Sequence, residues 1–192
     1  LGDTRQAIKY YEQALIVCRE IGDPQREAST LGNLGEAYRL LGDTHGAINL
    51  TEQALAIHRE IGSRRGEETA LGNLGLTYAG LDDTHRASEF YRQALAIARE
   101  IGDISGVAGH SFHTARLYAK QGNLTQALPL AQEAAQIWAQ VGNPNAQLAL
   151  QLVTEIQAQI TADADLLESF APLIQAIAAA ARIGDSNSPK NG

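Results

Sequence analysis

Hydrophobic residues recur along the chain with the spacing of an amphipathic helix, and the pattern itself recurs every forty residues. The first apolar stripe, at intervals of three and four, is formed by Ala7, Tyr11, Ala14, Leu15 and Cys18. Segments 1–23, 41–63 and 81–103 align without gaps, and 121–143 is a weaker copy. A fixed period of this length is typical of proteins built from stacked helical repeats.

Glycines and capping residues divide each period into two helices. Glycine stands where one helix should end, at Gly22, Gly62, Gly102 and Gly142. Side chains that suit an N-cap follow the other boundary, at Asp3, Asp43, Asp83 and Asn123. Asp23-Pro24 and Asn143-Pro144 place a cap before a proline, which favours a helix start. We therefore predict first helices of the repeats over 24–40, 64–80, 104–120 and 144–160, and second helices over 4–21, 44–61, 84–101, 124–141 and 163–183.

The predicted fold is all-α, a right-handed α-α superhelix of about four antiparallel helix pairs that follow an N-terminal half repeat. The half repeat covers 1–23 and has only a second helix, so one apolar flank of that helix is without its partner. The remaining boundaries are full repeats at 24–63, 64–103 and 104–143, degenerate capping helices at 144–183, and a disordered tail at 184–192. Pro172 should kink or restart the last helix.

The segment LGNLG occurs at 31–35 and again at 71–75, and each glycine needs a reason because glycine weakens a helix by about 1 kcal/mol. Gly35, Gly75 and Ala115 would let the two helices of a repeat approach closely. The order Leu-Gly-x-x-Tyr, then Ala, a large residue and Ala-Leu resembles the tetratricopeptide repeat. The period of forty exceeds that family's usual 34 and looks more like its long-helix members, the Leu-Gly-Asn repeat proteins of the LGN/Pins type and similar bacterial signalling arrays. Thr51, in place of a large residue, and Asp82, in place of a turn glycine, depart from the pattern.

The resemblance implies that the first helix of each repeat lines a concave groove that binds a peptide. Gly32 and Gly72 would then make room for that peptide. Asn33 and Asn73 would be neighbours on successive helices, with amides that can bond to a peptide backbone, and His113 continues the row. The alternative is that these asparagines bond to a neighbouring turn. Further candidate contacts, for which solvated surface charge is the alternative, are Glu36, Arg39 and Arg116.

The composition and charge of the chain argue against some classes of binding partner. The net charge of −7 and the pI near 5.2 argue against nucleic acid and against docking on an anionic membrane. The sequence has no apolar run of about 18 residues, the length that a membrane span needs. The single cysteine, Cys18, rules out an internal disulfide and favours a reducing, cytoplasmic compartment.

No motif for catalysis or for a cofactor stands out. His110 and His113 have a spacing that a metal could use, but no further ligand shares it, so we expect no metal and no cofactor. Phosphate loops, dinucleotide fingerprints and nucleophile elbows are absent from the sequence, and we expect no enzyme activity.

Three hypotheses about function remain. Stacked repeats form extended surfaces for peptides, so the first is a protein–protein interaction scaffold that binds a peptide segment of a partner protein. The alternative is a sensor or regulatory arm of a larger signalling ATPase or protease-like protein. The third is self-association through the exposed N-terminal half repeat.

Overall fold

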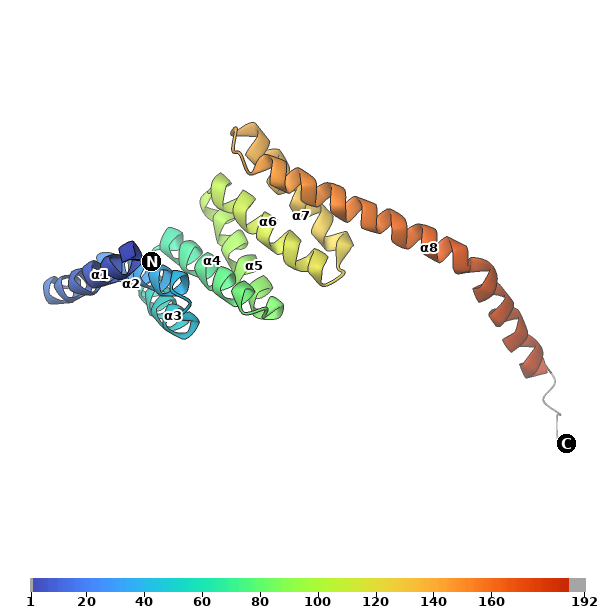
Figure 1. Cartoon of the computed structure of the whole chain (residues 1–192), viewed down its shortest axis with the longest axis horizontal. Coiled ribbons are helices and arrows are strands. Elements are labelled where there is room, and N and C mark those ends of the chain that lie inside the picture. The colour runs from blue at the N-terminus through green and yellow to red at the C-terminus, as the bar shows by residue number, and fades with distance from the viewer. Residues whose placement is uncertain (1, 187–192) are drawn as a thin grey trace.

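The chain folds into consecutive helices joined by tight turns (Figure 1). The computed structural model describes residues 2–186, and within that range there are eight helices and no strand. The helices are α1 (Gly2–Ile21), α2 (Pro24–Leu40), α3 (Thr44–Glu60), α4 (Arg64–Gly80), α5 (Thr84–Ile101), α6 (Ile104–Lys120), α7 (Leu124–Gln140) and α8 (Ala146–Ser186). Helices α1 to α7 agree with the predicted bounds to within two residues.

Capping side chains and left-handed residues place these boundaries, as the sequence predicted. Asp43 Oδ1 accepts a hydrogen bond from the backbone N–H of Gly46 at 2.9 Å, and Asp23, Asp83 and Asp103 make the same contact at their helices. Asn123 precedes α7 without such a bond, and the prediction for Asp3 is wrong because α1 already begins at Gly2. Asp82 takes a positive φ of 58° in the turn where its neighbours along the array have glycine.

Small residues bring the helices together, as predicted. A Cβ at Gly35 would lie 2.6 Å from Thr51 Oγ1, and one at Gly75 would lie 2.8 Å from the Tyr91 ring. Tyr91 is 2% exposed, so its ring fills the space that Gly75 leaves. Each helix packs mainly on its neighbours in the chain, which makes the described part an all-α helical-repeat superhelix.

The C-terminal part differs from the prediction. A single helix, α8, replaces the two helices expected over 144–160 and 163–183, and it runs through Pro172 without a restart. The turns of this array have glycine at the left-handed position except at Asp82, and no glycine stands between Gly142 and Gly184 to favour a break in the helix. Residues 184–186 of the expected tail belong to α8, and 187–192 lie outside the described residues.

Only the first part of α8 packs on the array. Ile156 is 1% exposed and contacts the α6–α7 pair through a cluster with Ala115, Ala127 and Ala131. Trp138 packs with Phe112 and with Ala149 of α8. Beyond this region α8 extends away from the stack and changes direction toward its C-terminal end (Figure 1). The first part of α8 therefore takes the place of one more first helix.

Candidate functional site

The first helices of the repeats border a row of hollows. One of about 340 Å³ lies between α2 and α4, and one of about 280 Å³ lies between α4 and α6. A hollow of about 310 Å³ between α1 and α2 and one of about 260 Å³ between α6 and α8 extend the row at its two ends. We call this row the groove.

The two predicted asparagines stand at the boundaries between hollows. Asn33 is exposed and lines both the α1–α2 and the α2–α4 hollow. Asn73 is half-buried and lines both the α2–α4 and the α4–α6 hollow. Neither side-chain amide is hydrogen-bonded to another residue of the described range, so the expected alternative, a bond to a neighbouring turn, is not what the structure has. Both amides keep their donors and acceptors available.

The two glycines that precede these asparagines have different environments. A Cβ at Gly32 would meet no atom within 4 Å, so this position is open as predicted. A Cβ at Gly72 would lie 2.7 Å from Cε1 of His110. The prediction that Gly72 makes room for a peptide is therefore wrong, because the imidazole of His110 occupies that room.

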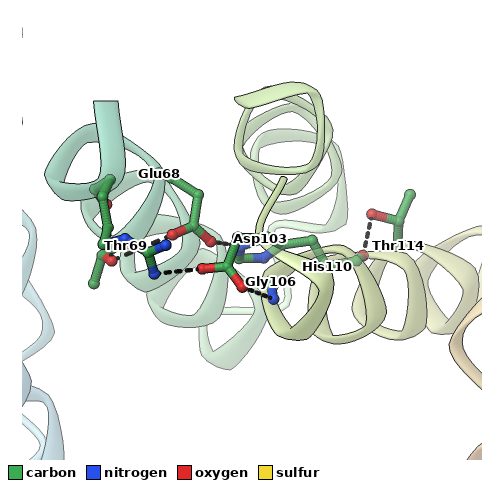
Figure 2. Close-up of polar contacts among 7 residues, drawn as sticks. Glu68, Thr69, Asp103, Gly106, His110 and Thr114 are labelled. Atoms are coloured by element: carbon green, nitrogen blue, oxygen red, sulfur yellow. Dashed lines mark hydrogen bonds and ion pairs between the residues drawn. The ribbon is translucent and has the colours of Figure 1, made fainter. Parts of the chain in front are cut away.

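His110 is held there by a buried carboxylate. Figure 2 shows Glu68 of α4 reaching across to His110 of α6, where Nε2 and Glu68 Oε1 form a close hydrogen bond. The hydroxyl of Thr69 donates to the other oxygen of Glu68 at 3.3 Å. A Cβ at Gly106 would lie 2.9 Å from Glu68 Oε1, so each member of the pair lies over a glycine of the opposite helix. The pair joins two successive repeats.

Our sequence analysis missed this pair, although the repeat carries a signal for it. Glu68 stands where the other repeats have Ala28 and Ala108, and His110 stands where the preceding repeat has Ala70. A charged residue at a position that is otherwise a buried alanine requires a partner. Two such departures from the period, forty-two positions apart, are each other's partner.

His113 lies in the groove but packs against its floor. Its ring is stacked on Tyr91 of α5, with centroids 5.0 Å apart and an interplanar angle of 9°. Burial lowers the pKa of His113 to about 4, and the positive charges of Arg116 and His110 act in the same direction. His113 is therefore a neutral imidazole at pH 7. Burial also raises the pKa of the Tyr91 hydroxyl, which has no hydrogen-bond partner within the described range.

The three predicted charged contacts are not equivalent. Arg39 donates to both carboxylate oxygens of Glu36, from Nε at 2.7 Å and from Nη2 at 2.6 Å, and this hydrogen bonding raises the pKa of Arg39. Arg116 is exposed on α6, with its guanidinium 5.7 Å from the centre of the Phe112 ring. It forms no ion pair with another residue among those the structure places. Of these three predicted contacts, Glu36 and Arg39 neutralise each other, and Arg116 is a cation without an ion-pair partner among the described residues.

No three His, Cys, Asp or Glu side chains of residues 2–186 converge so that they could hold a metal ion. No helix of the described part combines the length and the apolar character that a membrane span requires. Cys18 is buried as a free thiol.

Comparison with known proteins identifies the fold. Two family models described as tetratricopeptide repeat match this sequence, one at residues 1–60 and 28–100 and the other at 115–144. A search of curated proteins finds no match. Among solved structures, BtubC from P. vanneervenii is similar with a TM-score of 0.76 and 20% identity over 100% of this chain and 78% of that one.

Two further solved structures are similar over most of this chain but belong to longer chains. A signal transduction ATPase with numerous domains and a tetratricopeptide repeat sensor, from Pyrococcus horikoshii, has a TM-score of 0.76 and 21% identity over 91% of this chain and 28% of that one. A Rap protein complexed with competence and sporulation factor has a TM-score of 0.69 and 19% identity over 92% of this chain and 50% of that one. This chain therefore spans half or less of each, and at these identities the likeness concerns the fold alone.

The family models cover more than half of the chain, and the helix pairs, glycine contacts and row of hollows are those of a stacked repeat. The chain belongs to the tetratricopeptide repeat family and is a protein-interaction repeat module.

Proposed function

We propose that the groove binds a peptide segment of a partner protein, with Asn33 and Asn73 as the central contacts. The observation that carries this proposal is the position of the two amides, which border successive hollows and have no hydrogen-bond partner within the described chain. The first helices of successive repeats face each other across these hollows. An extended peptide that crosses them presents backbone N–H and C=O groups that both amides can satisfy.

The other predicted contacts have narrower roles in this proposal. Arg116 offers an unpaired positive charge to an acidic group of the peptide beside the α6–α8 hollow. Glu36 and Arg39 are already paired, so they contribute polar edges rather than free charge. His113 supplies a flat neutral surface in the α4–α6 hollow.

A displayed library of random peptides tests the proposal. Peptides selected on the wild-type chain are measured by fluorescence anisotropy against an Asn33→Ala/Asn73→Ala variant, with helicity checked by circular dichroism. The matched control is Asn49→Ala/Gln53→Ala, which removes two exposed amides from α3, outside the groove. We expect the groove variant to bind at least about tenfold more weakly, since each lost hydrogen bond contributes about 1 kcal/mol, and the control to bind as wild type. Equal binding by all three chains would remove the two asparagines from the site, and failure to select any peptide would remove the function.

A second candidate function is a sensor segment within a larger signalling protein. The observation that favours it is the similarity, over 91% of this chain, to an ATPase described as carrying a tetratricopeptide repeat sensor. In that case the groove would hold a segment of the same polypeptide. The reading frame around this sequence decides between the two, because a sensor requires a catalytic or nucleotide-binding domain in the same chain.

A further inference from the structure

Two residues that line the α4–α6 hollow have a buried polar atom without a partner, whereas the α2–α4 hollow has one such residue, His58, at Nδ1. Tyr91 Oη and His110 Nδ1 are both shielded from solvent, and neither makes a hydrogen bond to a described residue. Both residues line this hollow. A buried polar atom without a partner costs about 1–3 kcal/mol. A ligand group that reaches these atoms would recover that free energy.

Space for such a group exists on the α6 side. A Cβ at Gly109 would meet no atom within 4 Å, so this glycine borders open space rather than a packed neighbour. The corresponding positions one and two repeats earlier are Thr69 and Ser29. The α4–α6 hollow thus lacks a side chain that the other repeats carry.

The charges around the hollow favour an uncharged occupant. The Glu68 carboxylate is already met by His110 and by the Thr69 hydroxyl. His113 is neutral at pH 7 because burial lowers its pKa. The other residues that line the hollow carry no charge, so an ionised side chain would lose its hydration without gaining a counter-ion there.

We propose that the α4–α6 hollow receives the carboxamide of an asparagine or glutamine side chain of the bound peptide. A carboxamide carries an acceptor and two donors on one small planar group, which suits two orphaned atoms of different residues. The hydroxyl of Tyr91 can donate to the carboxamide oxygen. His110 Nδ1 can accept from the carboxamide N–H or, when it carries a proton, donate to the carboxamide oxygen, so a carboxamide suits either form of the ring. This proposal rests on the peptide-binding function above and adds a side-chain preference at one place in the groove.

The test uses single amino-acid derivatives as probes, so that it does not depend on peptide selection. N-acetyl-glutamine methylamide, its glutamate analogue and its leucine analogue are titrated into the ¹⁵N-labelled chain, and the imidazole nitrogens of His110 are followed by NMR. We expect a saturable shift of His110 Nδ1 with the glutamine probe, at least about tenfold tighter than with either analogue, because two buried polar atoms gain partners.

Two variants locate the binding. Gly109→Gln places a carboxamide of the chain itself in the hollow and should abolish the shift. Gly80→Gln adds the same side chain at an exposed glycine at the end of α4, where a Cβ would also meet nothing, and should leave the shift intact. The proposal would be overturned by an equal response to the leucine or glutamate probe, or by a response that survives Gly109→Gln. The absence of any saturable shift would also overturn it and would mean that only water enters the hollow. If the probe binds but no peptide is selected, the preference of the hollow stands and the peptide-binding function fails.

Discussion

Gly72 and His110 share one space between α4 and α6, because a Cβ at Gly72 would lie 2.7 Å from Cε1 of His110. The imidazole cannot move aside freely, since Nε2 is bonded to the buried carboxylate of Glu68. A glycine that looks like a weak point of the helix is thus required by a side chain of the next repeat. Gly32 stands at the same position one repeat earlier and faces open space.

Alanine substitutions at these two glycines should therefore have opposite effects on stability. Gly32→Ala should raise the free energy of unfolding by about 1 kcal/mol through helix propensity alone. Gly72→Ala gains the same helix propensity, but the added methyl group forces the Glu68–His110 pair apart. We therefore expect the free energy of unfolding to fall by about 1–2 kcal/mol overall. Urea unfolding followed by circular dichroism measures both. Shifts of the same sign would show that His110 adapts to a methyl group at little cost.

The pKa of His113 predicts how stability depends on pH. Its value of about 4 lies below the ordinary 6.5, so between these values the unfolded chain binds the proton more readily than the folded chain. The contribution of His113 to the free energy of unfolding is fully present above pH 6.5. It declines as the pH falls toward 4 and changes no further below that. The expected loss between pH 7 and pH 5 is about 2 kcal/mol. Burial also lowers the pKa of His58, which adds a loss in the same direction.

A His113→Phe variant isolates this contribution. Phenylalanine keeps an aromatic ring against Tyr91 but cannot be protonated, so the fall in unfolding free energy between pH 7 and pH 5 should be smaller by about 2 kcal/mol than in the wild type. The measurement is urea unfolding at several pH values in that interval. A variant whose stability follows pH as the wild type does would show that His113 is protonated equally easily in both states.

The sequence was a good guide to features that depend on local chemistry. Caps such as Asp43 and contacts such as Gly75 against Tyr91 repeat because each repeat meets the same neighbour. It was a poorer guide where the neighbour changes. Gly32 and Gly72 have the same local sequence, but His110 packs over the second, while Ala70 is the corresponding residue of the preceding repeat. The sequence of one repeat therefore cannot show whether its glycine faces open space or a side chain of the next repeat.

The C-terminal error has a similar origin. The repeat period predicts one more helix pair over 144–160 and 163–183, whereas the missing glycine near residue 161 was the stronger signal. A turn between two helices needs a residue that tolerates a positive φ, and no glycine is available there.

Burial of Ile156 predicts that the first part of α8 is an integral part of the array. Ile156→Ala should lower the free energy of unfolding by about 2–4 kcal/mol, because its side chain is 1% exposed and no neighbour can fill the cavity without strain. Leu150→Ala, on the same helix but 48% exposed, is the control and should cost well under 1 kcal/mol. Chemical unfolding of both variants decides. Equal small effects would mean that α8 is only loosely attached.

The outer face of α1 carries an apolar stripe, and the next repeat partly buries the residues at two of the corresponding positions. Tyr10, Val17 and Ile21 are 61%, 52% and 59% exposed. One repeat later, Leu50 and Ile57 occupy the first two of these positions and pack against the preceding repeat through a cluster with Leu15 and Leu31. Within residues 2–186, α1 packs mainly on α2, which leaves this stripe uncovered.

We expect this chain to self-associate through that stripe, because a second copy can remove the same apolar surface from water. Sedimentation velocity of the wild type should show a fraction of dimer that rises with protein concentration. The Val17→Lys/Ile21→Lys variant should remain monomeric. Leu40→Lys/Ile104→Lys replaces two apolar residues that are equally exposed on other helices, so it should associate as the wild type does. A wild type that stays monomeric at high concentration, or a control that dissociates like the α1 variant, would contradict the prediction. Either result would mean that the stripe is covered by something other than a copy of this chain, or tolerates water.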